Sequence, residues 1–173
     1  MKRLKNIASI STLLTLYYSF FYPHIDYGLM LWGGASKTAL NKIFVIQKKA
    51  IRTIANTHYN AHTTPLFAIL KVLKLEDIYE MQLAKFIFGL YKNNMPKPLQ
   101  SFFSTNSEIH HYGTRNRCNP IIRLHKSNVA ARSIFSQSYK LWYNMESDVK
   151  GLTSLFAFSK RYKKTILQKY LAM

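Results

Sequence analysis

The sequence predicts a mainly α-helical protein: a small helical bundle, then a long loop, then one or two further helices. Apolar residues recur at spacings of three and four in several stretches, which is the period of an amphipathic helix. No stretch alternates apolar and polar residues convincingly, as a half-buried strand would. The 173-residue chain is 48% hydrophobic, which is typical of a globular protein and argues against disorder.

The first element is predicted as a mostly buried helix over residues 4–22, ending near Pro23 because proline disfavours helix before and at its own position. Its basic start and apolar body resemble a signal peptide or anchor. However, five Ser and Thr residues interrupt the apolar stretch, so a buried helix is the better interpretation. A short aromatic stretch, residues 27–34, follows and ends at the turn signal Gly33-Gly34.

The clearest helix is predicted over residues 37–56, where one side is apolar and the other basic. The apolar stripe consists of Leu40, Phe44, Gln47, Ile51 and Ile54. The opposite side carries Lys37, Lys42, Lys48, Lys49 and Arg52. Charge on a helix is usually just solvated, but here no acid lies between Asp26 and Glu76 to balance it.

Further helices are predicted from residue 64, over 76–93, over 129–143 and over 154–171. Acids begin the 76–93 helix, where the helix dipole favours them, and its largely apolar surface predicts deep burial. In the last helix, Leu155, Phe158, Tyr162 and Ile166 are predicted to face inward. Residues 93–127 are predicted as an extended connector, because they are rich in Pro, Asn, Ser and Thr. These patterns predict a helical domain at 1–93, a basic connector at 94–128 and a helical extension at 129–173.

Charge restricts the class of partner. Twenty-five Lys and Arg against seven Asp and Glu give a net charge of +18, which attracts polyanions. Nucleic acid is the expected partner, with an anionic membrane surface or a merely solvated basic face as alternatives. Cys118 is the single cysteine, so no internal disulfide can form, and a reducing compartment fits better than secretion. The sequence does not fix the location, and an intracellular one, the nucleus included, is compatible with it.

Catalytic and metal chemistry find little support in the residues. Polymerases need carboxylates that converge on metal ions, and none of the seven acids sits in a paired-Asp turn. His58 and His62 have the spacing that would place two zinc ligands on one helix face, but Pro65 would soon break such a helix. A single cysteine also rules out a zinc knuckle. We therefore expect no catalytic residue, no metal site and no cofactor. Lys42, Lys48, Lys49 and Arg52 are the candidate phosphate contacts, together with Arg115 and Arg117 beside Tyr112.

Several short motifs follow one another along the chain: Tyr17-Tyr18-Ser19 leading to Tyr27-Gly28, Leu31-Trp32-Gly33, Ile46-Gln47-Lys48-Lys49-Ala50-Ile51-Arg52, His62-Thr63-Thr64-Pro65-Leu66-Phe67, Tyr112-Gly113-Thr114-Arg115-Asn116, Lys140-Leu141-Trp142, and Phe158 with the basic helix that follows. Their order resembles the region after the palm domain in reverse transcriptases of non-LTR (LINE-type, jockey-like) retrotransposons. Each motif is weak alone, and their shared order makes the match specific.

The resemblance implies that the first half is thumb-like and grips a template–primer duplex, and that the second half is the family's C-terminal extension. It also implies catalytic aspartates in fingers and palm domains upstream of Met1, with which an intact parent would associate. One departure is Tyr143-Asn144-Met145-Glu146, where the family pattern ends in proline. Without that proline the preceding helix is free to continue.

Three functions stay open at this point. The first is a truncated reverse-transcriptase fragment that binds nucleic acid without sequence preference and cannot polymerise. The second is a non-functional remnant of a decaying element. The third is a small basic membrane-associated helical protein that uses its N-terminal apolar helix.

Overall fold

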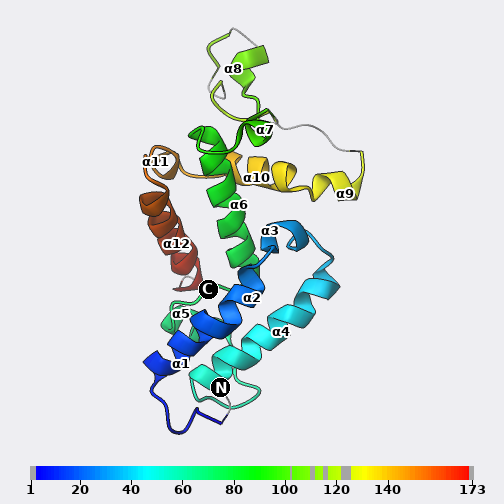
Figure 1. The fold of residues 1–173 in the computed structure, drawn as a ribbon. Helices are drawn as coiled ribbons and strands as arrows, with labels where there is room; N and C mark the ends of the chain where they lie inside the picture. The colour runs from blue at the N-terminus through cyan, green and yellow to red at the C-terminus, as the bar shows by residue number, and fades with distance from the viewer. Residues whose placement is uncertain (1–2, 102, 110–111, 115–116, 122–125, 172–173) are drawn as a thin grey trace. The chain divides into compact units, whose positions relative to one another are not determined.

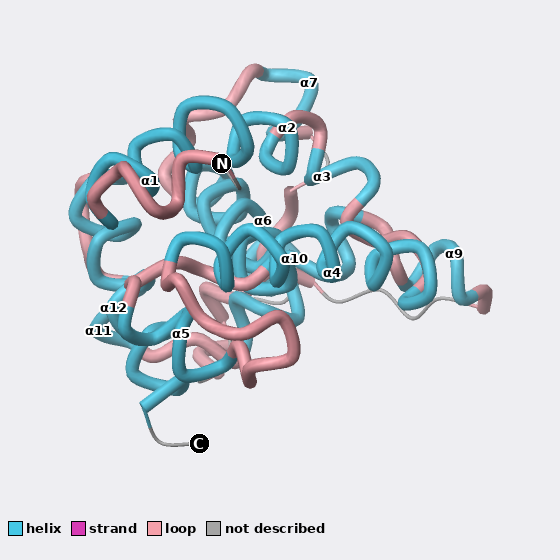
Figure 2. The backbone as a smooth tube through the Cα atoms, turned by 90° about the horizontal axis from the view of Figure 1, so that it is seen from below, coloured by secondary structure: helices cyan, strands magenta, loops and turns pink. Residues whose placement is uncertain are grey.

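A computed structural model describes residues 3–101, 103–109, 112–114, 117–121 and 126–171, with the side chain of residue 171 left out. Helices joined by loops make up this part of the chain, and its single β-bridge joins Thr105 to Pro120 (Figures 1 and 2). The predicted mainly α fold is confirmed. The chain forms two compact units: residues 1–79 with 163–173, and residues 80–162. The division at residues 93 and 128 stays a prediction.

In the first unit, a continuous helical rod consists of α1 (Ile10–Leu16), the π-helical turn η1 (Tyr17–Phe21) and α2 (Tyr22–Asp26). The Ser9 side chain caps its start, so the prediction of a helix from residue 4 is wrong. The end predicted near Pro23 is also wrong. Tyr22 N–H donates to the carbonyl of Tyr17, five residues earlier, and Pro23 then stands in the first turn of α2, where proline is tolerated.

The rod is buried along one side only, through Leu13, Tyr17 and Ile25. Ile7 and Phe20 are 85% and 70% exposed, which contradicts the prediction of a mostly buried element. Figure 1 shows the rod beside α4 (Lys37–Ile54), which it contacts.

The segment between the rod and α4 forms a compact turn around α3 (Leu29–Trp32). Gly28 adopts a left-handed conformation at φ 63°, which glycine tolerates best. The Trp32 indole donates to the carbonyl of Tyr27 across 2.9 Å. Gly33 is buried against the ring of Tyr79, leaving no room there for a Cβ atom. Backbone conformation and packing therefore account for Gly28, Trp32 and Gly33 of these motifs, whereas the side chains of Tyr27 and Leu31 are exposed.

The α4 helix confirms the predicted apolar stripe, and its most buried polar residue is Gln47. Gln47 Nε2 donates to the Tyr17 hydroxyl and to the Leu73 carbonyl, each across 3.0 Å, while Oε1 accepts from Leu75 N–H across 2.9 Å. One amide on α4 thus binds η1, the link that follows α5 (Thr64–Ile69), and the first residue of α6 (Leu75–Tyr91).

The end of α12 (Leu155–Leu171) also belongs to the first unit from residue 163 onward. The Tyr170 hydroxyl donates to Asp77 and accepts from Lys74 N–H. The Lys74 ammonium lies 4.6 Å from the centre of the Tyr170 ring. The acid at the start of α6 therefore has a partner besides the helix dipole.

In the second unit the core is aromatic. Phe88 stacks on Phe158 with ring centres 4.3 Å apart, and Trp142 packs against Tyr91. The Tyr162 hydroxyl donates to Glu80 across 2.5 Å. The predicted inward residues Phe158 and Tyr162 are buried, as is Ile166 in the first unit, but Leu155 is 48% exposed and that prediction is wrong.

The remaining helices are short, apart from α10 (Ile134–Tyr143). They are α7 (Lys97–Gln100), α8 (Asn106–Ile109), α9 (Asn128–Ala131) and α11 (Ser147–Lys150). The predicted extended connector thus contains two single-turn helices, α7 and α8. The α10 helix ends at Tyr143, where Asn144 N–H donates to Lys140, so the missing proline does not prolong it. Within the described ranges, no helix combines the length and the apolar composition needed to cross a lipid bilayer.

Candidate nucleic-acid interface

The basic side of α4 divides into two exposed lysines and two half-buried cations. Lys42 and Lys49 are exposed, seven residues apart on one side of the helix. Lys48 is half-buried, and its ammonium lies 4.3 Å from the centre of the Phe44 ring. Arg52 is half-buried, and its Nε donates to the Ala61 carbonyl across 2.8 Å. The four predicted residues therefore share one helix, and two of them also have a packing role.

The end of α4 is shaped by a Schellman motif. Asn56 takes the left-handed conformation at φ 49°. Its N–H donates to the Thr53 carbonyl, and Thr57 N–H donates to the Arg52 carbonyl. The chain is thereby turned back toward α4, and the Arg52–Ala61 bond fixes the loop that follows.

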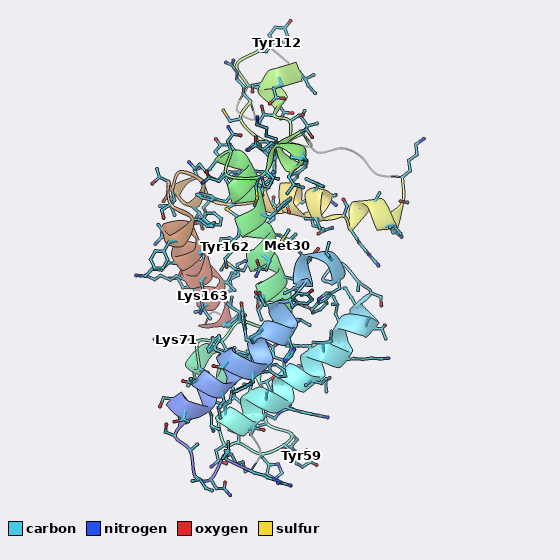
Figure 3. All side chains as sticks on the ribbon, viewed as in Figure 1. Met30, Tyr59, Lys71, Tyr112, Tyr162 and Lys163 are labelled. Carbon is cyan, nitrogen blue, oxygen red and sulfur yellow. The ribbon has the colours of Figure 1, made fainter. Side chains whose placement is uncertain are left out.

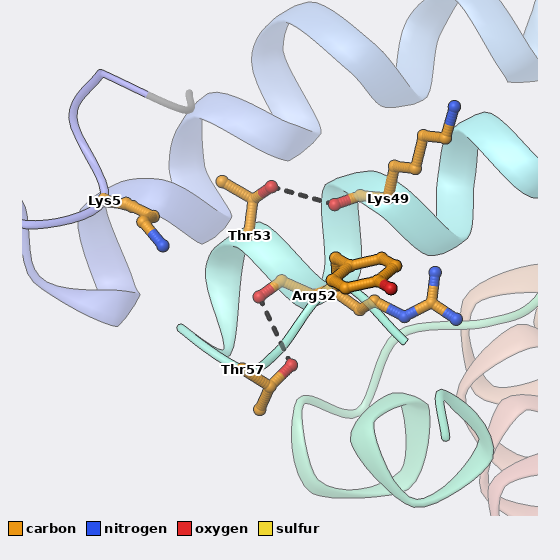
Figure 4. A pocket seen from close by; sticks show the side chains of 6 residues that line it. Lys5, Lys49, Arg52, Thr53 and Thr57 are labelled. Atoms are coloured by element: carbon orange, nitrogen blue, oxygen red, sulfur yellow. Dashed lines mark hydrogen bonds between the residues drawn. The ribbon is translucent and has the colours of Figure 1, made fainter. Parts of the chain in front are cut away.

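A cavity of about 340 Å³ opens at this end of α4 (Figure 4). We call it the α4 cavity. Its lining consists of Lys5, Lys49, Arg52, Thr53, Thr57 and Tyr59. Three of these six residues are cationic and none is acidic. The arrangement is therefore suited to an anionic ligand that also presents an apolar surface.

The stretch of sequence that contains α4 is free of acids. Residues 27–75 contain no Asp or Glu, so the cations of α4 meet no carboxylate from their own stretch of chain. An uncompensated basic surface attracts phosphate groups and speeds their encounter with the protein.

The second predicted group of cations, Arg115 and Arg117, falls between α8 and α9 in the sequence. Ser107 N–H donates to the Arg117 carbonyl and Asn106 N–H donates to that of Asn119, which closes the base of the loop. Arg117 is exposed, and Tyr112 is 79% exposed and points away from the ribbon (Figure 3). Arg115 lies outside the described residues.

Four members of the α4 cavity were not among the predicted contacts: Lys5, Thr53, Thr57 and Tyr59. Lys5 belongs to a segment that was assigned to a buried helix. Tyr59 lies in a loop that was considered only for its histidines. The usable signal was the unbroken absence of acids next to an aromatic residue, which is typical of nucleic-acid surfaces.

The predicted absence of a metal site stays a prediction. His58 and His62 lie in the loop after α4 rather than on one helix face, and His58 Nδ1 lies 2.8 Å from Asn60 Oδ1. Among the described residues, no three His, Cys, Asp or Glu side chains gather closely enough to hold a metal ion.

A comparison with curated proteins finds a match to the RNA-directed DNA polymerase from mobile element jockey of Drosophila melanogaster. The match is 28% identical over 106 residues, or 60% of this chain, and it spans only 12% of the relative's length. No family model and no solved structure matches the chain. Over most of its length, the chain is thus similar to part of a retrotransposon reverse transcriptase.

Proposed function

We propose that this chain is the thumb and downstream region of a jockey-like non-LTR reverse transcriptase, and that it binds the backbone of a template–primer duplex without sequence preference. The observation that carries the proposal is the basic side of α4, where Lys42 and Lys49 are exposed and no acid lies in residues 27–75. The similarity to the jockey polymerase supports it, because a polymerase must hold nucleic acid.

Each cation has a distinct part in this proposal. Lys42 and Lys49 contact phosphates as mobile point charges. Lys48 adds its charge from above the Phe44 ring, and Arg52 offers its terminal guanidinium nitrogens while Nε binds Ala61. Arg115 and Arg117 supply a second set of phosphate contacts from their loop. Phosphate contacts position a duplex but read no bases, so binding is independent of sequence.

We also propose that the chain does not polymerise on its own. The sequence lacks a paired-Asp turn, and two acids at the start of α6, Asp77 and Glu80, accept hydrogen bonds from Tyr170 and Tyr162. In the intact parent, fingers and palm domains would supply the catalytic aspartates. Primer extension with dNTPs and Mg²⁺ should therefore match a heat-inactivated control, and template-dependent incorporation would refute this part.

The test of binding is fluorescence anisotropy with two labelled duplexes of unrelated sequence over a series of salt concentrations. We expect equal affinities, and a linear fall of log K with log salt as counterions are released. Binding to one duplex only, or binding insensitive to salt, would contradict the proposal.

The exposed Ile7, Phe20 and Leu31 side chains favour one rival, a membrane-associated protein. The rival predicts that the chain sediments with phosphatidylserine vesicles at a salt concentration that abolishes duplex binding. The proposed function predicts that it stays in the supernatant under that condition.

A further inference from the structure

We propose that the α4 cavity holds one unpaired nucleotide of a strand whose duplex portion lies along α4, an inference that rests on the proposed function. The base would lie against the ring of Tyr59, and the adjoining phosphates beside Lys5, Lys49 and Arg52. The cavity would thus recognise the junction between duplex and single strand.

The charges of the cavity select an anionic group. Lys5 and Lys49 come from separate segments of the chain, and Arg52 has its Nε bound to Ala61, so its terminal nitrogens face a fixed direction. Pre-positioned guanidinium groups bind phosphate in a bidentate manner at low entropic cost. Among the described residues that line the cavity, no carboxylate neutralises these cations.

The remaining wall is apolar in character. The Thr53 hydroxyl donates to the Lys49 carbonyl across 2.9 Å, and the Thr57 hydroxyl donates to the Arg52 carbonyl across 3.5 Å (Figure 4). Because both hydroxyl groups already face carbonyls of the helix end, these threonines add little hydrogen-bond donor capacity to a lining that is mostly apolar. A free phosphate would gain little from such a wall, whereas the flat face of a base would gain van der Waals contact.

Tyr59 supplies a surface for stacking. Its side chain is 81% exposed and lies on the loop that the Arg52–Ala61 bond holds in place (Figure 3). The neighbouring ring of His58 lies 5.0 Å away, and the Asn60 side chain holds that histidine. An exposed ring beside uncompensated cations is the combination with which proteins bind single strands.

Size and position agree with this occupant. The volume of about 340 Å³ falls at the lower end of the roughly 300–1,000 Å³ typical of ligand pockets. Lys42 lies about 10 Å from Lys49 along the helix axis, on the side away from the cavity, given a rise of about 1.5 Å per residue. A backbone that follows α4 past Lys42 therefore reaches the cavity within a few nucleotides.

The experiment compares a blunt duplex with the same duplex carrying an overhang whose first unpaired base is 2-aminopurine. Both overhang polarities are tested by anisotropy and by 2-aminopurine emission. We expect the parent to prefer the overhang and to quench its emission. Tyr59→Leu should lose roughly 5- to 100-fold of the overhang affinity and all of the quenching, while its blunt-duplex affinity stays unchanged.

Two variants serve as controls. Tyr59→Phe keeps a ring and should retain both signals. Tyr27→Leu removes a ring that is 86% exposed in the same unit but outside the cavity, and it should behave as the parent. Equal affinity of the parent for both duplexes, or quenching that survives Tyr59→Leu, would overturn the inference and leave the proposed function intact. Absence of binding to either duplex would overturn both.

Discussion

The side-chain amide of Gln47 donates from Nε2 to the hydroxyl of Tyr17 across 3.0 Å, in a fully buried site. The same amide bonds Leu73 and Leu75, so a single polar side chain connects three segments of the first unit. Buried polar groups that are fully satisfied specify one arrangement of the core, because any other leaves a polar group without a partner.

Replacing Gln47 with leucine should destabilise the protein by at least about 3 kcal/mol, because Tyr17, Leu73 and Leu75 would each keep a buried polar group without its partner. Urea unfolding followed by circular dichroism measures the loss. The exposed Gln168→Leu is the matched control and should change stability by no more than about 0.5 kcal/mol. A similar small change for Gln47→Leu would show that the amide does not connect the core.

Burial raises the pKa of the Tyr17 hydroxyl to about 12, and the Gln47 hydrogen bond opposes part of that rise. The folded protein therefore keeps the Tyr17 phenol neutral up to a higher pH than the unfolded chain, in which this tyrosine ionises near pH 10. The free energy of unfolding keeps its full value from this group below pH 10, and it falls as the pH rises toward about 12, because the unfolded chain then loses the phenol proton first.

Tyr17→Phe should accordingly remove this pH dependence. The parent should lose roughly 2–3 kcal/mol more than the variant over that range. Unfolding midpoints of the two proteins, measured at closely spaced pH values, test this. Parallel curves would contradict the assignment of a raised pKa to Tyr17.

Gly33→Ala should destabilise the first unit, because the added methyl would overlap the ring of Tyr79 and the Leu29 carbonyl. Overpacking of this kind costs about 1–3 kcal/mol. Gly113→Ala is the control, since no atom of the described residues lies within 4 Å of a Cβ at that position. Thermal melts of both variants decide the matter, and equal melting temperatures would refute the close contact.

Arg52→Lys should separate the structural part of this residue from its charge. The lysine keeps the positive charge but cannot reproduce the Nε bond to Ala61, so stability should fall by about 1.5–3 kcal/mol. The salt dependence of duplex binding should change little. Amide hydrogen exchange in residues 57–63 should become faster in the variant, because the bond that holds this loop is lost. Unchanged protection there would contradict the structural role of Arg52.

Residue periodicity predicted the fold class, the apolar stripe of α4 and the deep burial of most of the helix expected over 76–93, because helical period and burial are local properties of the sequence. It failed at Pro23, where a π-helical turn restarts the hydrogen-bond pattern, and at Leu155, which begins its helix exposed. Sequence placed Gln47 on the apolar side but could not identify Tyr17, Leu73 and Leu75 as its partners. Such partners depend on tertiary contacts.

The candidate site was predictable to the same degree. Lys42 and Lys49 are exposed on one helix as expected, whereas the α4 cavity also needs Lys5 and Tyr59, which only folding brings to Arg52. The Arg52 bond to a loop carbonyl likewise has no sequence signal. Charge composition indicates a polyanionic partner, but it does not indicate where on the protein an unpaired nucleotide of that partner would bind.

The most direct test of nucleic-acid binding by α4 compares two double variants with the same loss of charge. Lys42→Gln with Lys49→Gln removes the exposed lysines of α4, and Lys160→Gln with Lys164→Gln removes two exposed lysines of α12. Neither pair disturbs the contacts of Lys48 or Arg52. The measured quantity is the slope of log K against log salt for a blunt duplex. Our account predicts that the α4 pair lowers its magnitude by about two and the α12 pair by far less. Equal decreases from the two variants would show diffuse attraction by net charge and would contradict the account.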